Sequence, residues 1–339
     1  MRVISLDVAK GIGIFLVVLK HNSLLKEHAP IFFDAISTFN VPLFFLLSGA
    51  FLPQRVTAAF AWHRLQILSR PFAVGVLLAL PLQLIDLSHP VNDWFPLGVF
   101  WATGNSVMNA PLWFLTSLTA AVFFLSLTEK LSLTGTRGAL VGGALFLFGL
   151  WLMSIPEIRN DLPKDQLGRF WGLPWSVDIV LIPLGLMMSG RALGRFLQTP
   201  LNTPLMDLAL LASFLGLFLW GFSAGRPALD LNNRMAVHVW PLLGCALSGM
   251  GMVLSLSRCI TYLKGAWIAS LQKLGANSLI VLICHWPLQQ VFIRIFKRFE
   301  HNTLTELMIS VLACVLTYLF AMHIVAPRPL LRKWFTGRA

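Results

Sequence analysis

The sequence predicts an all-α integral membrane protein, built as a bundle of about ten transmembrane helices. Of its 339 residues, 57% are hydrophobic and only 12% are charged, whereas about a quarter of the residues of a soluble domain are charged. The apolar residues recur in blocks of about 18–22, the length that a helix needs to cross roughly 30 Å of hydrocarbon. Repeated crossings call for helices, because a helix satisfies its own backbone hydrogen bonds in lipid. The lipid bilayer is therefore the first expected partner.

The apolar blocks predict where the spans lie. We expect them at 5–24, 31–53, 71–88, 111–128, 138–156, 173–190, 205–222, 237–255, 276–295 and 306–326. More Lys and Arg residues fall between spans on the N-terminal side than on the opposite side, which predicts that both termini are cytoplasmic. We expect 1–339 to form a single transmembrane domain, with 327–339 as a short basic cytoplasmic tail.

Charge and motif content exclude several classes of protein. The net charge of +12 comes from cations scattered over many connectors, so no nucleic-acid partner is expected. The four cysteines lack CxxC spacing, and no metal site is expected. HExxH, GxSxG and Walker patterns are also missing from the sequence, which leaves metalloprotease, serine-hydrolase and nucleotide-hydrolase functions without support.

Three polar residues interrupt the first apolar block: Asp7, Lys10 and His21. At about 100° per residue, Lys10 and His21 project from nearly one face of a helix, about 16 Å apart along its axis. Ionisable groups at membrane depth are costly, so they commonly line a functional passage. A second interpretation stays open, in which Lys10 extends to the cytoplasmic interface beside Asp7 and His21 lies at the outer interface.

Further polar residues follow on the predicted cytoplasmic side. Ser48 precedes Gly49 at the end of the second span, a pair that lets another helix come close. The connector at 55–70 carries Arg64 and Arg70, whose guanidinium groups offer forked donors to phosphate. Ordinary helix packing is an alternative explanation for Ser48 and Gly49. Positive-inside topology is an alternative explanation for the two arginines.

Four segments, in this order, resemble the acyltransferase-3 family of membrane O-acyltransferases. They are LDVAKGIGI at 6–14 with His21, VPLFFLLSG at 41–49, PLWFL at 111–115, and LGANSL at 274–279 with His285. The AKG form around Lys10 is similar to the branch that modifies exopolysaccharide sugars, the exopolysaccharide/fucose O-acetylase-like branch. Many members have arginine at this place; lysine keeps the charge and loses the fork.

The resemblance implies transfer of an acetyl or other short acyl group from acetyl-CoA to a hydroxyl of a cell-surface or extracellular polysaccharide, or of its lipid-linked precursor. The expected location is the bacterial inner membrane. Acyl-CoA, as co-substrate, and a glycan acceptor are the implied partners, without a metal. A homo-oligomer or a polysaccharide-synthesis complex is left open.

The resemblance also predicts the site residues. The expected catalytic residues are His21, Lys10 and Asp7; those expected to bind the cofactor are Lys10, Arg64, Arg70 and Ser48; those expected to bind the acceptor are His285, Asn277, Asp178, Asn232 and Trp113. His21 is suited to act as a general base toward a sugar hydroxyl or as a transient acyl carrier, and the sequence leaves both roles open. Asp7 is expected to hold Lys10 in place or, as the second alternative, to orient a distant partner.

Two rival functions are compatible with polar residues inside a membrane bundle. A transporter or flippase for a glycan or small solute would use them as a substrate or proton path. The sequence shows no obvious pair of broken helices or inverted halves, so this class ranks second. A structural subunit of a glycan-synthesis complex would tolerate the loss of His21, whereas an enzyme or a transporter would not.

Overall fold

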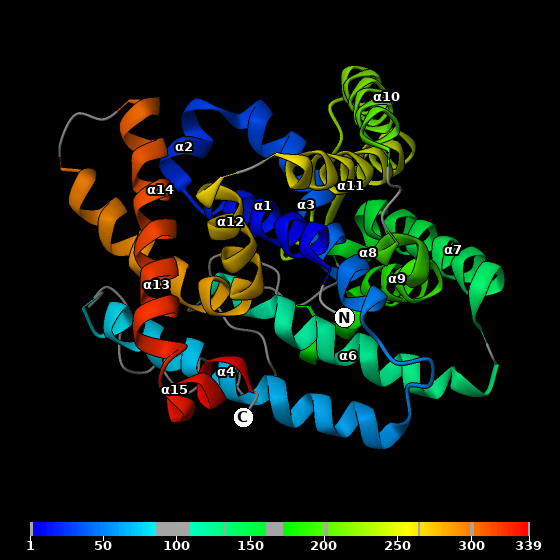
Figure 1. Ribbon diagram of the computed structural model, residues 1–339, viewed down its shortest axis with the longest axis horizontal. Coiled ribbons are helices and arrows are strands. Elements are labelled where there is room, and N and C mark those ends of the chain that lie inside the picture. The colour runs from blue at the N-terminus through cyan, green and yellow to red at the C-terminus, as the bar shows by residue number, and fades with distance from the viewer. Residues whose placement is uncertain are drawn as a thin grey trace.

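The computed structural model describes residues 3–85, 109–131, 133–160, 172–199, 203–263, 265–298 and 302–337 as a bundle of helices (Figure 1). The helices are α1 (Ile4–Lys20), α2 (Ser23–His28), α3 (Pro30–Ala50), α4 (Ala58–Ile85), α6 (Trp113–Leu127), α7 (Gly135–Ser154), α8 (Pro156–Asn160), α9 (Leu181–Gln198), α10 (Pro204–Ser223), α11 (Val239–Tyr262), α12 (Ala266–Ala276), α13 (Ser278–Phe296), α14 (Thr303–Phe320) and α15 (Pro329–Thr336). Short 3-10 turns are η2 (Ala110–Leu112), η3 (Glu129–Leu131) and η4 (Pro174–Ile179), and the π-helical segment η5 (Ala321–Val325) continues α14.

Several helices of the bundle have the length and the apolar composition needed to span a membrane. In the part of the chain that the structure describes, eight helices are long and apolar enough to cross a bilayer. Helix α10 has few buried residues, and Leu205, Leu208 and Leu219 are more than half exposed, as expected of a helix that faces lipid. The chain is thus an all-α, multi-pass membrane protein. The total of ten spans and the cytoplasmic termini stay predictions.

The predicted span boundaries need two corrections. The segment 55–70 is not a connector, because one continuous helix, α4, begins at Ala58 and includes both Pro71 and Pro81. Proline is tolerated inside membrane helices because neighbouring groups satisfy the freed carbonyls. The predicted span 173–190 begins instead as the 3-10 turn η4, where Trp175 and Ser176 have positive φ; the helix α9 starts at Leu181 and continues to Gln198.

Helix α1 occupies the middle of the bundle, with α12, α11 and α3 beside it (Figure 1). Glycines allow the closest approach: a Cβ added at Gly11 would overlap the carbonyl oxygen of Leu271, and one added at Gly275 would overlap that of Asp7. Small residues bring membrane helices together in this way because apolar burial supplies little force between helices in lipid. The backbone of α1 is therefore fixed against α12 close to Lys10.

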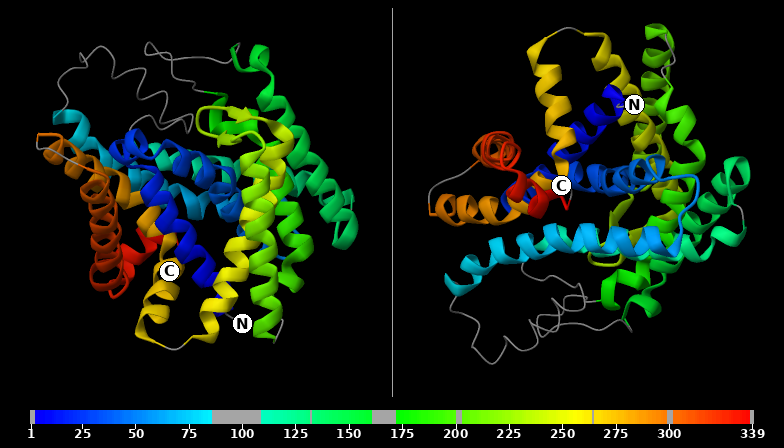
Figure 2. Two further views of the ribbon diagram at one scale, coloured as in Figure 1. Left: turned by 90° about the horizontal axis from the view of Figure 1, so that it is seen from above. Right: turned by 60° about the horizontal axis from the view of Figure 1, so that its bottom comes forward.

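A small antiparallel hairpin, β1 (Ala228–Asp230) and β2 (Met235–Val237), was not expected from the sequence. Its turn carries Arg234, whose Nε donates to Asp178 Oδ2 at 2.7 Å and whose Nη2 donates to Asp178 Oδ1 at 3.2 Å. The left view of Figure 2 places this hairpin at the top, whereas α1 begins near the bottom. The hairpin thus lies at the end of the molecule opposite the N-terminus.

Candidate active site

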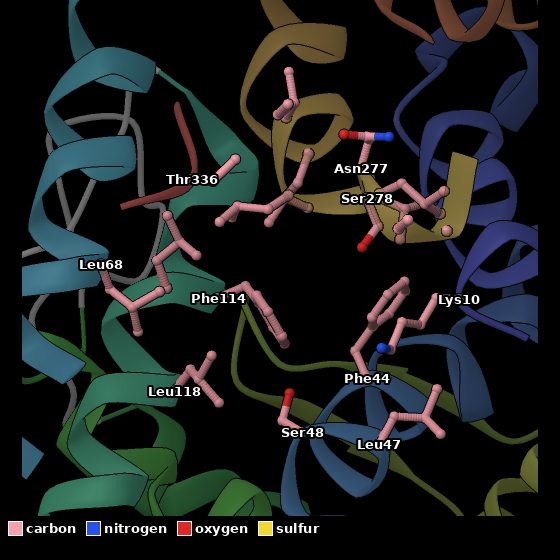
Figure 3. Close-up of a pocket in the computed structure, with 18 of the residues that line it drawn as sticks. Lys10, Phe44, Leu47, Ser48, Leu68, Phe114, Leu118, Asn277, Ser278 and Thr336 are labelled. Atoms are coloured by element: carbon pink, nitrogen blue, oxygen red, sulfur yellow. The ribbon is translucent and has the colours of Figure 1, made fainter. Parts of the chain in front are cut away.

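A large cavity of about 910 Å³ extends along α1 from the N-terminal side of the bundle. Its walls come from α1, α3, α4, α6, α12, α13 and α15. Figure 3 shows Lys10, Ser48 and Ser278 around the cavity, with the rings of Phe44 and Phe114 on opposite sides of it. A mainly apolar cavity with a few polar groups is typical of a ligand site.

Asp7 and Phe51 both contact Lys10 at the cavity wall. Its Nζ lies 3.5 Å from Asp7 Oδ1, an i, i+3 ion pair, and 4.2 Å from the centroid of the Phe51 ring. The Lys10 side chain keeps 23% of its surface exposed. Lys10 therefore presents a positioned ammonium group to whatever occupies the cavity.

The large cavity, called the first cavity below, is lined mostly by cations among its charged residues. Its charged lining residues are Asp7, Lys10, Arg64, Lys273 and Arg332. Cations outnumber the single carboxylate among the described lining residues, which favours an anionic ligand. The arginines in particular suit phosphate oxygens, because the guanidinium fork donates two parallel hydrogen bonds.

Arg70 takes a different place from the other predicted cofactor residues. It is outside the lining of the cavity, and its Nη1 donates to the carbonyl oxygen of Gly337 at 3.2 Å. This contact joins α4 to the end of α15. Lys10, Arg64 and Ser48 thus line one cavity, whereas Arg70 does not line it.

A second cavity, of about 220 Å³, opens on the side of the β hairpin. Its charged and amide lining residues are Lys20, Lys26, Asp34, Asn40, Asp230, Asn232 and Asn233. Burial tends to raise the pKa of the Asp230 carboxyl, but the Lys20 charge and hydrogen bonds from Asn233 outweigh burial and lower this pKa below its usual value. The carboxylate form of Asp230 is therefore stabilised beside the cavity.

His21 lies where the two cavities meet. The residues that line both are Val17, His21, Val41 and Trp113. Among these residues, only His21 carries a side chain with a nitrogen that can accept a proton. A ligand from each side can therefore approach the same imidazole.

The position of His21 follows from the way that α1 ends. Asn22, fully buried, begins α2 by accepting hydrogen bonds from the backbone N–H groups of Leu24 at 3.1 Å and Leu25 at 3.3 Å. Its amide nitrogen donates to the Glu306 carbonyl at 2.6 Å and to Ser310 Oγ at 2.9 Å. The residue next to His21 is thus tied to both α2 and α14.

One turn before His21, the buried Asn40 of α3 braces α1. With its amide in the orientation that satisfies both partners, Asn40 donates to the Gly13 carbonyl at 3.0 Å and accepts from the Val17 N–H at 3.1 Å. These two groups are an i, i+4 pair, which bond each other in an uninterrupted helix. The orientation of α1 just ahead of His21 is therefore fixed by a side chain of a neighbouring helix.

The predicted acceptor residues do not gather in one place. Trp113 lines both cavities, Asn232 lines the second cavity, and Asn277 lines the first cavity near Lys10. Asp178 lines neither cavity and pairs with Arg234 in the hairpin turn. His285 is fully buried, also outside both linings, with its ring beside that of His21. Of the five predicted acceptor residues, only Trp113 and Asn232 therefore line the second cavity.

Several lining residues were missed in the sequence. Lys273 and Arg332 of the first cavity lie on the short helices α12 and α15, which a search for 20-residue apolar blocks passes over. Asp34 and Lys20 of the second cavity lie at the ends of expected spans, where a charge is unremarkable. The sequence did point toward Asp230, because it lies in the same connector as the predicted acceptor residue Asn232.

The bundle and its cavities together define a class: a multi-pass membrane protein with a cationic cavity that meets a second, polar cavity at a histidine. A family model described as "Acyltransferase domain" (Acyl_transf_3) matches residues 3–326, nearly the whole chain. The chain therefore belongs to the acyltransferase-3 family, which is the family that the sequence motifs predicted. No curated protein and no solved structure matches the chain.

Proposed function

We propose that the protein transfers an acetyl or other short acyl group from acetyl-CoA to a hydroxyl of a cell-surface or extracellular polysaccharide, or of its lipid-linked precursor. The observation that carries this proposal is the place of His21 at the junction of two cavities that open on different sides. We place the protein in the bacterial inner membrane, with the larger cavity facing the cytoplasm, where acyl-CoA is made.

The larger cavity supplies what an acyl-CoA requires. Its cations, among them Lys10 and Arg64, complement the phosphate charges of the nucleotide. Ser48 and Asn277 offer hydrogen-bonding groups to the amides of the pantetheine arm. The arm lies along the wall of α1, so that the thioester reaches His21, which is about 16 Å from Lys10 along the helix.

The smaller cavity supplies what a sugar hydroxyl requires. Its lysines and aspartates balance each other in charge, and Asn232 and Asn233 add neutral donors and acceptors. Its volume of about 220 Å³ lies below the roughly 300–1,000 Å³ of sites that hold drug-sized ligands. These properties favour one uncharged sugar unit as the acceptor group at His21.

The chemistry needs one proton acceptor. An imidazole nitrogen of His21 takes the proton from the sugar hydroxyl as its oxygen attacks the thioester carbonyl carbon. The new C–O bond forms, the C–S bond breaks, and the departing CoA thiolate takes the proton from His21. In the alternative, the nitrogen of His21 attacks first, CoA leaves, and the acyl group passes from His21 to the hydroxyl. The junction position of His21 is compatible with both routes.

Purified protein supplied with acetyl-labelled acetyl-CoA and a glycan acceptor tests the proposal. We expect label on the glycan with the wild type and none with His21→Ala, at equal protein levels. His63→Ala is the matched control, because His63 is exposed on α4 and lies outside both cavities. Full transfer by His21→Ala would refute the role of His21.

A single turnover without acceptor separates the two routes. Label that stays on the wild-type protein, and not on His21→Ala, would identify His21 as an acyl carrier. If the wild-type protein stays unlabelled, and label appears on the glycan once the glycan is added, His21 acts as a general base.

A further inference from the structure

The short helix α15 lies beyond the residues that the family model matches, and yet it forms part of the large cavity. The match ends at residue 326, whereas α15 runs from Pro329 to Thr336. Arg332 and Thr336 both line the cavity, and Figure 3 shows Thr336 at its edge. The segment expected to be a basic tail is therefore a wall of the site, contributed by residues outside the family match.

Specific contacts hold α15 in this place. The ring of Phe335 is buried and lies 5.5 Å from the ring of Phe320, centroid to centroid. Gly337 ends the helix in the left-handed conformation, with φ of 71°, and a Cβ there would overlap the carbonyl oxygen of Ile67 on α4. The hydrogen bond from Arg70 to the Gly337 carbonyl adds a second link to α4. The docking of α15 is thus fixed at its C-terminal end.

The two cations in the middle of α15 differ in their positions. Arg332 lines the cavity, whereas Lys333 does not, although both are exposed. An exposed lining residue lies at the open rim of the cavity, away from His21 at its inner end. Arg332 therefore adds a guanidinium fork at the open rim of the cavity.

Resting on the acyl-CoA donor proposed above, we propose that Arg332 binds the 3′-phosphate of coenzyme A and that α15 completes the donor site. The 3′-phosphate is at the end of the cofactor opposite the thioester, so a molecule with its thioester at His21 brings this phosphate to the rim. A guanidinium fork matches the oxygens of a phosphate monoester. Lys10, Arg64 and Lys273 line the same cavity and serve the remaining charges.

Binding of coenzyme A and of 3′-dephospho-coenzyme A to the full-length protein in detergent tests this assignment. We expect the wild type to prefer coenzyme A by about tenfold or more, since a charged hydrogen bond contributes enough for that ratio. Arg332→Gln should lower the affinity for coenzyme A to that for the dephospho form and leave the latter unchanged. Lys333→Gln, the matched control on the same helix, should retain the wild-type preference.

The outcomes distinguish this inference from the proposed function. A wild-type preference that Arg332→Gln leaves intact would overturn the role of Arg332, while the acyl-CoA donor would stand. An equal loss of affinity for both nucleotides in Arg332→Gln would overturn the assignment to the 3′-phosphate. A wild type that binds neither nucleotide would overturn the proposed donor and this inference with it.

Discussion

The imidazole rings of His21 and His285 lie 5.3 Å apart, centroid to centroid, with 51° between their planes. His285 Nδ1 is 2.8 Å from the Val281 carbonyl oxygen; because a carbonyl only accepts, Nδ1 carries the proton and Nε2 holds a lone pair. That Nε2 is buried and has no hydrogen-bond partner among the described residues. His285 thus packs against the His21 ring and lines neither cavity.

This arrangement predicts that His285 positions His21 and does not bind the donor. His285→Leu should lower kcat about tenfold to a hundredfold, a part of the roughly 10²–10⁴-fold that a positioned base contributes, with the Kd for acetyl-CoA unchanged. His285→Gln keeps a donor and an acceptor and should retain more activity than His285→Leu. Steady-state kinetics with equilibrium binding would check both. An unchanged kcat in His285→Leu would contradict the positioning role.

Lys10 should govern donor binding. Lys10→Ala removes the ammonium group from the cavity wall, and we expect the affinity for acetyl-CoA to fall by about tenfold or more, the effect of one charged hydrogen bond. Lys10→Arg keeps the charge and should stay within a few-fold of the wild type. Lys130→Ala is the control, since Lys130 is exposed and lies away from both cavities. Equal affinity in Lys10→Ala and the wild type would favour a lysine that only anchors α1 at the interface.

Asn40 should be necessary for the geometry of α1. Asn40→Ala removes the side chain that bonds the Gly13 carbonyl and the Val17 N–H, and we expect a loss of about 1–3 kcal/mol in stability. Because these groups lie one turn before His21, acyl transfer should fall more than acetyl-CoA binding. Thermal unfolding in detergent, together with transfer and binding assays, measures the three quantities. If transfer and binding fall in equal proportion, Asn40 does not act through His21.

The contact between α1 and α12 should not tolerate a methyl group. Gly275→Ala would drive a Cβ into the Asp7 carbonyl oxygen, which is backbone and has no room to yield, so we expect a loss of about 1–3 kcal/mol from overpacking. Gly143→Ala is the matched control, because a Cβ at this helical glycine meets nothing within 4 Å. The control should be neutral or stabilising by up to about 1 kcal/mol. Equal melting temperatures for the two variants would refute the close contact.

The sequence predicted the parts of the site that depend on one helix. Helical geometry placed Lys10 and His21 on one face, and both line the large cavity. The family prediction is confirmed by the match to residues 3–326. These inferences succeeded because residue spacing and motif order are local properties of the chain.

The missed parts depend on contacts between distant elements. Arg332 reaches the cavity only because α15 docks on α4 through Gly337. Arg70 was predicted to bind the cofactor, but the same docking directs its guanidinium to the Gly337 carbonyl. The start of α4 was obscured because the charged residues near Arg64 resemble a connector. The hairpin brings Asp230 into one cavity with Lys20, a contact between distant segments that sequence spacing does not reveal.

The four residues common to both cavities also bear on membrane energetics. Val17, Val41 and Trp113 surround the junction with apolar side chains, leaving His21 as the polar element there. In an energised membrane, a continuous water column between the cavities would let protons run down their gradient. In the proposed acyl transfer, we expect these apolar side chains to keep the two cavities from joining into one water column, so that the reaction proceeds without dissipating the proton-motive force.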